Sequence, residues 1–250
     1  MSTHSDFILT PIASIINDAA HSCSLLSNGM SSYPLGEYLL QSIFLKMTGA
    51  QEQKFKCVVW ELATVDYIYR YNLLREGLRG GECSSYEDKN KIFVSLCNFI
   101  NSKHNFAIKN YDALINTAKD SIEKFHSTFS HLLGQSLNTF HQFVNQLAKA
   151  SKEEEQNKFI KNPKNLFDAG VQLSGNIGIV SDIYRMLWEH RNRCAHNLQS
   201  YQDNQPSFSE LNKPKYKYYN YLIFFYILIL IDYKLIEYFK KFLEITEKVV

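Results

Sequence analysis

The segment YLIFFYILILI, residues 221–231, is the most apolar run of the chain and lies inside a longer helical pattern over 215–248. Its residues are apolar on every side of a helix, which is typical of a helix at the centre of a bundle or in a dimer interface. The run ends at Asp232-Tyr233-Lys234 and is shorter than the roughly 20 residues that a membrane-spanning helix needs. The sequence therefore predicts a long, buried C-terminal helix and no membrane segment.

Upstream of this run, apolar residues recur at helical spacing, and no strand-like alternation of any length appears. Glycine, proline and charged residues interrupt the pattern and predict the connecting loops. The expected helices span 5–26, 35–76 with a bend near Thr48-Gly49, 89–102, 111–149 and 177–197. Pro11 is expected to be tolerated in an early turn of the first helix. The predicted fold is an all-α helical bundle with a long C-terminal core helix.

The domain organisation follows from length and from one charged segment. The chain has 250 residues, which is enough for one large domain or two small ones. We expect a single all-helical domain over 1–250. The segment 149–164 is highly charged and ends in Asn162-Pro163, so it is read as a linker or a frayed helix end. It would separate an N-terminal helical part, 1–150, from a second part, 165–250.

Composition restricts the cell compartment and the class of function. The formal net charge is +2, which argues against a nucleic-acid coat protein that binds mainly by electrostatics. The five cysteines are odd in number and widely spaced, as expected for buried thiols in a reducing compartment. The first residues are polar and do not resemble a signal peptide. These features predict a cytoplasmic protein.

The segment LWEHRNRCAHN, residues 187–197, has chemistry that packing alone does not explain. Arg191 falls on the apolar stripe of the predicted helix, where a buried side chain is expected. Burying an unpaired charge costs several kcal/mol or more, so Arg191 needs an anion, a partner subunit or a water-filled cleft. The apolar members of this stripe are Val180, Ile183, Leu187, Cys194 and Leu198.

Two further polar residues can converge with Arg191. His196 follows five residues later, roughly 140° around the helix and about 7.5 Å along it, and Asn192 lies one turn before His196. A guanidinium suits a phosphate, an imidazole can move protons near neutral pH, and an amide can hold a hydroxyl or a phosphate oxygen. Together they suit cleavage of RNA by its own 2′-hydroxyl, a reaction that needs no metal and no external nucleophile.

The string RNRCAH, followed by Asn197, resembles the R-N-x-x-x-H motif of HEPN-domain ribonucleases. Its spelling is most similar to that of the abortive-infection (Abi-like) branch, where R-N-x-C-A-H-N is frequent. In that branch an Arg-Leu-Tyr element often follows. Here Tyr201 stands at the position of the tyrosine, while Gln199 and Ser200 replace the arginine and leucine.

The resemblance implies an all-helical, metal-independent endoribonuclease without a cofactor. It would make Arg191, Asn192 and His196 the catalytic residues, with Arg193 and Tyr201 as candidate substrate-binding residues. It further implies a homodimer in which two motifs face one scissile phosphate of an RNA. A role in phage defence or as a toxin would follow, with an antitoxin as a candidate partner.

Alternative interpretations of the motif remain open. Arg191 could belong to a structural network, paired with Glu189 or with another carboxylate; Glu61 and Asp66 are candidates. A metal site would need His190, Cys194 and His196, which helical spacing does not bring together, and no fourth ligand is evident. The chain could also be a non-catalytic, HEPN-like dimerisation module or an RNA- or nucleotide-binding module. A nucleotide-handling protein of another class has little support, because the chain has no Walker loop and no GxGxxG.

Overall fold

We describe the protein from a computed structural model. It describes residues 2–23, 33–75, 83–108, 110–133, 136–150, 165–166, 172–173, 177–196 and 218–247. Tyr201 lies outside these residues, as does nearly all of the predicted linker 149–164. The prediction of an all-α helical bundle is confirmed, with one addition: β1 (Gln172–Leu173) pairs antiparallel with β2 (Ile177–Ile179), a two-stranded ribbon that the sequence did not predict.

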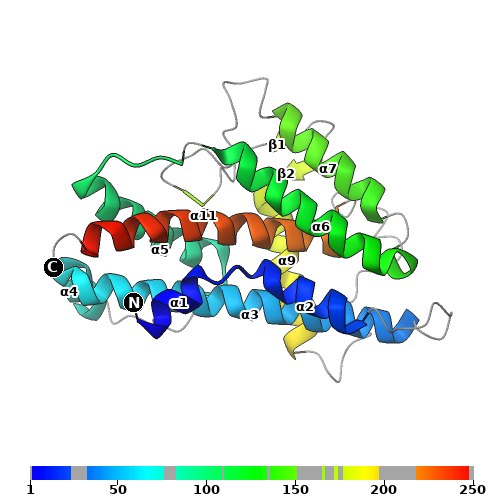
Figure 1. The fold of residues 1–250 in the computed structure, drawn as a ribbon, viewed down its shortest axis with the longest axis horizontal. Coiled ribbons are helices and arrows are strands. Elements are labelled where there is room, and N and C mark those ends of the chain that lie inside the picture. Colours follow the sequence, from blue (N-terminus) through cyan, green and yellow to red (C-terminus); the bar gives the residue numbers. More distant parts are fainter. Residues whose placement is uncertain are drawn as a thin grey trace.

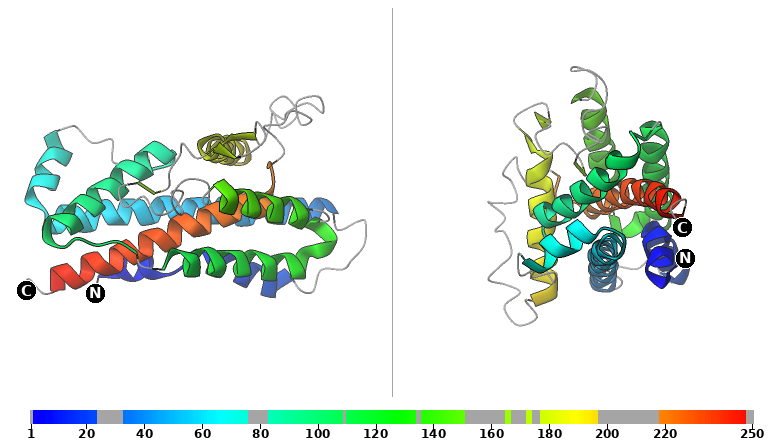
Figure 2. Two further views of the ribbon diagram at one scale, coloured as in Figure 1. Left: turned by 90° about the horizontal axis from the view of Figure 1, so that it is seen from above. Right: turned by 90° about the vertical axis from the view of Figure 1, so that its left-hand side faces the viewer.

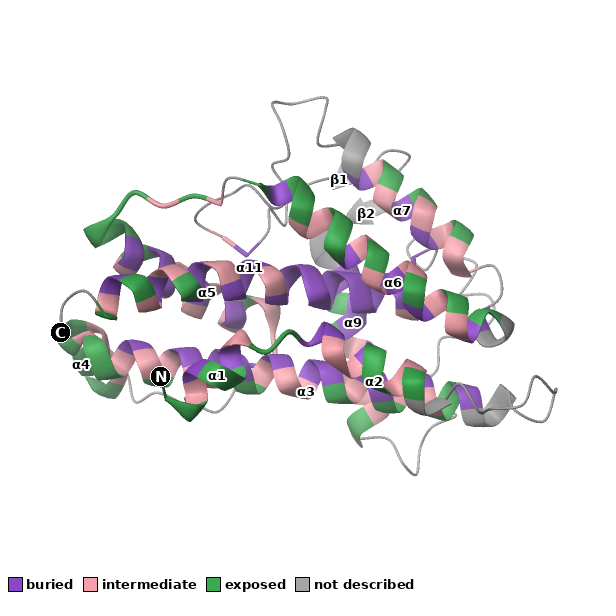
Figure 3. Ribbon diagram, viewed as in Figure 1, coloured by how far each residue is buried: buried purple, intermediate pink, exposed green. Residues whose placement is uncertain are grey.

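Helix α11 (Tyr221–Glu247) runs through the centre of the bundle, as predicted (Figure 1). Every residue from Leu222 to Asp232 is buried, so all sides of the helix contact protein. The helices around it are α1 (Thr3–Leu9), α3 (Tyr33–Val65), α5 (Tyr86–Lys103), α6 (Tyr111–Leu133), α7 (Ser136–Ala150) and α9 (Val180–His196). Figure 3 shows the resulting distribution, with buried residues along α11 and exposed ones on the outward sides of α6, α7 and α2 (Ala13–Cys23).

The structure corrects several predicted helix boundaries. The first predicted helix is two helices, because Thr10 adopts an extended conformation before Pro11 and α1 ends there. The predicted helix over 35–76 continues unbroken through Gly49 and ends instead at Val65; Asp66 then caps α4 (Tyr67–Arg75) by accepting the Tyr69 N–H at 2.9 Å. The stretch 111–149 forms α6 and α7, α9 begins at Val180, and the last helix begins at Tyr221.

Helix α9, which carries the motif, lies across the bundle. The left view of Figure 2 shows α9 end-on while α3 and α11 run along the long axis. α9 packs against α3 and α11 with Ile183, Tyr184, Met186, Leu187 and His190, which are all buried. The crossing brings the motif residues next to the middle of α3. Of the described helices, none is both long enough and apolar enough to cross a membrane.

Candidate functional site

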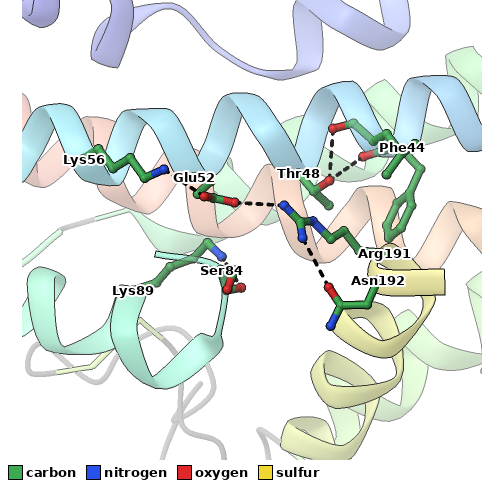
Figure 4. A network of polar contacts seen from close by, with 9 residues as sticks. Phe44, Thr48, Glu52, Lys56, Ser84, Lys89, Arg191 and Asn192 are labelled. Atoms are coloured by element: carbon green, nitrogen blue, oxygen red, sulfur yellow. Dashed lines mark hydrogen bonds and ion pairs between the residues drawn. The ribbon is translucent and has the colours of Figure 1, made fainter. Parts of the chain in front are cut away.

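Arg191 meets a carboxylate from α3. Its Nη2 donates to Glu52 Oε2 at 3.2 Å, and its Nη1 donates to the Asn192 side-chain oxygen at 3.2 Å (Figure 4). The two ion-pair side chains are 25% and 15% exposed, so the pair is partly shielded from solvent. The expectation that Arg191 requires an anion near the buried face is met by Glu52. Both catalytic candidates on this turn, Arg191 and Asn192, are in contact.

The carboxylates named as candidate partners of Arg191 were the wrong ones. Glu189 lies beside Arg185, at 3.9 Å, and Glu61 lies beside His4, at 3.7 Å. Asp66 caps α4. Since α9 crosses α3 near its middle, residues nine or more positions beyond Glu52 lie about 13 Å or further along the helix axis. The position at which α9 crosses α3 could not be predicted from the sequence.

Three cations surround Glu52. Lys56 Nζ binds its Oε1 at 2.9 Å and Arg191 binds Oε2; Lys89 of α5 lies below Glu52 in Figure 4 and interacts with it electrostatically. Lys89 is 4% exposed, and its Nζ donates to the Ser84 carbonyl oxygen at 2.7 Å. Burial lowers the pKa of Lys89 to about 8; Glu52 opposes that shift, and the nearby Arg191 adds to it.

These groups border a hollow between α3, α5, α9 and α11. It is open to solvent on one side, and its interior has room for about one water-sized group. Arg191, Glu52 and Lys89 contribute charged groups to its wall, and Tyr184 and Trp188 contribute aromatic rings. Trp188 is 36% exposed, whereas Tyr184 is buried, so Trp188 is the more accessible ring. Arg191 is the more exposed of the two cations in this wall, so a ligand larger than a water molecule would meet Arg191 first, at the mouth of the hollow.

Arg193, a predicted substrate-binding residue, faces the segment that leads into α11. Its Nη2 donates to the Tyr219 hydroxyl at 2.9 Å, and its guanidinium carbon lies 5.9 Å from the centre of that ring. The substrate-binding role of Arg193 stays a prediction. The observed contact holds the C-terminal part of α9 against the beginning of α11.

His190 is a buried residue that sequence reasoning considered only as a metal ligand. Its Nδ1 lies 2.6 Å from the Tyr219 hydroxyl and its Nε2 lies 2.9 Å from the Tyr221 hydroxyl, which donates to Glu37 Oε1 at 3.1 Å. Since Tyr221 donates to Glu37, it accepts from Nε2–H, and Tyr219 donates to Nδ1. The four hydrogen bonds therefore form one chain in which each group donates to the next, from the Arg193 guanidinium through Tyr219, His190 and Tyr221 to the Glu37 carboxylate. Burial, and to a lesser degree Arg193, lowers the pKa of His190 to about 4, so the ring is neutral at pH 7.

The described residues contain no group of three His, Cys, Asp or Glu side chains that could hold a metal ion. His190 and Cys194 are neighbours, with Sγ 3.6 Å from Nε2, but both ring nitrogens of His190 are already bonded to tyrosine hydroxyls. Burial raises the pKa of the Cys194 thiol to about 11, which keeps it protonated.

His196, the third catalytic candidate, is the last residue of α9. Its side chain lies outside the described residues, and so does Tyr201. Arg191 and Asn192 are in contact, and their convergence with His196 stays a prediction. Glu52, Lys89 and the tyrosines around His190 were missed; the available signals were the position of Glu52 one turn from Lys56 and the Tyr-rich segment before the apolar run.

Comparison with known proteins gives no relative for this chain: no family model, no curated protein and no solved structure matches it. Its function must be inferred from the geometry of the site and from the motif.

Proposed function

We propose that this protein is a metal-independent endoribonuclease that uses the motif over 191–197. The observation that supports this most is the placement of Arg191. Its guanidinium is partly exposed at the wall of a hollow and is bonded to Asn192 beside it. Described residues accept a hydrogen bond from each Nη atom, which leaves further N–H groups of the guanidinium for a ligand.

The reaction assigned to these residues is attack of a ribose 2′-hydroxyl on the adjacent phosphate. His196 acts as the base that removes the 2′-hydroxyl proton or as the acid that protonates the departing 5′-oxygen. Arg191 stabilises the negative charge of the phosphorane, an effect worth roughly 3 kcal/mol in a site shielded from water. Asn192 orients the sugar or a phosphate oxygen. The products are a 2′,3′-cyclic phosphate and a 5′-hydroxyl.

The proposed active form is a homodimer. One histidine cannot easily remove one proton and deliver another in the same step. A second copy of the chain, with its own motif facing the same phosphate, would supply the second imidazole. The RNA would then lie between the two α9 helices.

The test is cleavage of total cellular RNA in the presence of a chelator. Wild-type protein is expected to cut RNA and leave cyclic phosphate ends, while Arg191→Ala and His196→Ala lose at least about a hundredfold in rate. His104→Ala, at an exposed histidine beyond α5, is the matched control and should cut like wild type. Cleavage that requires added divalent metal, or undiminished cleavage by His196→Ala, would reject the proposal.

The resemblance to the Abi-like branch supports a role in phage defence or as a toxin in the cytoplasm, with an antitoxin as a partner. Expression of the wild-type chain should then arrest growth, and Arg191→Ala or His196→Ala should relieve the arrest. Growth that is equally impaired by the wild type and by both variants would separate the toxicity from the motif.

One observation favours a second candidate, a non-catalytic HEPN-like dimerisation or RNA-binding module. Glu52 neutralises Arg191 within the protein, so Arg191 has a structural role without any substrate. In that case the purified chain would dimerise or bind RNA and leave it intact under every condition of the cleavage test. The same assay therefore distinguishes the two functions.

A further inference from the structure

The hollow beside Arg191 has an excess of positive charge. Among the described residues that line it, Lys89 and Arg191 are cations and Glu52 is an anion; Lys56 binds Glu52 but does not line the hollow. Lys56 and Arg191 bind that carboxylate directly, whereas no described carboxylate lies within ion-pair distance of the Lys89 ammonium group. Glu52 balances one of these two cations, and the nearby Asp88 carboxylate also acts on Lys89, so the described wall retains at most about one positive charge to attract an anionic group.

Lys89 is an unusual residue to bury. Its ammonium group donates to the Ser84 carbonyl oxygen and lies 5.8 Å from the centre of the Tyr184 ring. An ammonium group has three N–H donors, so donors remain after the bond to Ser84. A lysine whose stem is packed in protein and whose head lies at the wall of a hollow is costly unless it meets an anion there. Arg191, on the facing helix, lines the same hollow.

A buried acceptor provides a second, independent observation. Gln51 is fully buried and lines the hollow; its Nε2 donates to the Leu228 carbonyl oxygen at 3.0 Å. Its Oε1 has no hydrogen-bond partner among the described residues. A buried carbonyl oxygen of this kind usually accepts a hydrogen bond, and a water molecule or one hydroxyl of a ligand fits the space and would supply the donor. The hollow thus presents cations towards an anion at its mouth and, further in, an acceptor for one hydroxyl group, and a phosphate with a neighbouring hydroxyl offers both.

We propose that Lys89 and Arg191 together bind one phosphate group of an RNA at the mouth of this hollow. Lys89 would then be a substrate-binding residue that lies far from the motif in sequence, on α5 rather than on α9. The identity of the ligand as RNA rests on the proposed function; the phosphate chemistry rests on the charges. Trp188 lies at the hollow one turn before Arg191, where an adjacent base can stack on it.

The test measures binding separately from cleavage. A short RNA with 2′-O-methyl groups cannot attack its own phosphates, so fluorescence anisotropy reports affinity alone. Lys89→Gln is expected to weaken binding by about tenfold or more, because a charge-assisted hydrogen bond is lost. The slope of log affinity against log salt should fall by about 0.7. Lys91→Gln, on the exposed side of the same helix, is the matched control and should bind like wild type.

Two further variants and a competition with inorganic phosphate test whether the protein is folded and whether the bound phosphate belongs to RNA. Lys89→Arg keeps the charge and should retain most of the affinity, whereas a variant that had merely unfolded would lose its cooperative thermal transition. Trp188→Ala should weaken the binding of RNA and leave the competition by inorganic phosphate unchanged. If phosphate competes and RNA does not bind, the hollow is a site for a free anion and the assignment to RNA is wrong.

The outcomes separate this inference from the proposed nuclease activity. If the wild type cuts RNA and folded Lys89→Gln binds the uncleavable RNA as tightly, Lys89 has no role in binding and the inference is overturned. If the wild type does not cut RNA but binds it in a Lys89-dependent manner, the nuclease proposal fails and the binding site stands. Equal losses in Lys89→Gln and Lys91→Gln would indicate a general electrostatic effect and would also overturn the inference.

Discussion

His190 is held neutral by its surroundings, which makes the stability of the protein depend on pH. The folded pKa of about 4 lies below the ordinary value of 6.5, because the ring is buried and Arg193 is near. As the pH falls below 6.5, the unfolded chain takes up a proton at this residue and the folded chain does not. The contribution of His190 to stability is therefore complete above pH 6.5 and is lost progressively towards pH 4.

We expect the free energy of unfolding to fall by up to about 3 kcal/mol between pH 7 and pH 4 through this residue alone. The measurement is urea denaturation of wild type and His190→Gln at several pH values. At pH 7 the variant should be less stable, since it loses hydrogen bonds to Tyr219 or Tyr221. The difference should shrink as the solution is acidified, and a difference that stays constant down to pH 4.5 would contradict the assignment.

At the scale of residues, the sequence was informative where one position broke a strong pattern. Because Arg191 falls on an apolar stripe, the sequence predicted that its guanidinium faces the buried side of the helix and needs an anion there. In the structure this anion is Glu52. The partner itself was not predictable, because α3 offers several charged residues and periodicity does not say where another helix crosses. Lys89 was equally hidden: a lysine between polar neighbours gives no sign of burial until α5 packs against α3 and contacts Tyr184 of α9.

At the scale of elements, a buried ion pair joins α3 to α11. Lys54 Nζ lies 2.6 Å from Asp232 Oδ1, and both side chains are almost inaccessible. The other carboxylate oxygen, Oδ2, accepts the N–H of Ile12 at 2.8 Å, in the turn between α1 and α2. One carboxylate thus connects three segments of the bundle, and its charge is balanced from α3.

Lys54→Met should lower the free energy of unfolding by about 3–5 kcal/mol, because Asp232 remains as a buried charge without its counter-ion. Adding Asp232→Asn removes that charge and leaves a side-chain oxygen for the Ile12 N–H, so the double variant should be more stable than Lys54→Met. Urea denaturation of the two variants and the wild type provides the comparison. A double variant less stable than the single one would show that the unpaired charge is not the main cost.

The ends of helices could be predicted from the sequence where a nearby residue sets them, such as a capping side chain. The helical spacing of apolar residues was sufficient to predict that α5 and α11 exist and are helices. Ser85 caps the beginning of α5, because its hydroxyl accepts the Asp88 N–H. Pro11 and Asp66 were underestimated as breaks: each ends a helix whose apolar spacing continues beyond it. The ribbon of β1 and β2 is too short to produce a visible alternation, so pairing across the ribbon could be recognised in three dimensions alone.

At the scale of the whole molecule, α11 organises the site without taking part in its chemistry. Because α11 is apolar on all sides, α3, α5 and α9 must pack around it, and this brings the charged faces of three distant segments to one hollow. The central position of α11 was predictable from its composition. The meeting of α3, α5 and α9 was not, since it depends on crossing angles and on loops that carry no periodic signal.

A ligand that joins three segments of the fold should stabilise the whole molecule. If the uncleavable RNA binds the native hollow and not the unfolded chain, a concentration of about one hundred times Kd adds roughly 2.7 kcal/mol to the free energy of unfolding. For a protein of this size that corresponds to a rise in Tm of about 5–10 °C. Differential scanning fluorimetry with wild type, Lys89→Gln and Lys91→Gln tests this at fixed RNA concentration. Wild type and Lys91→Gln should show the rise and Lys89→Gln should show much less of it; an equal rise in all three would place the RNA elsewhere on the surface.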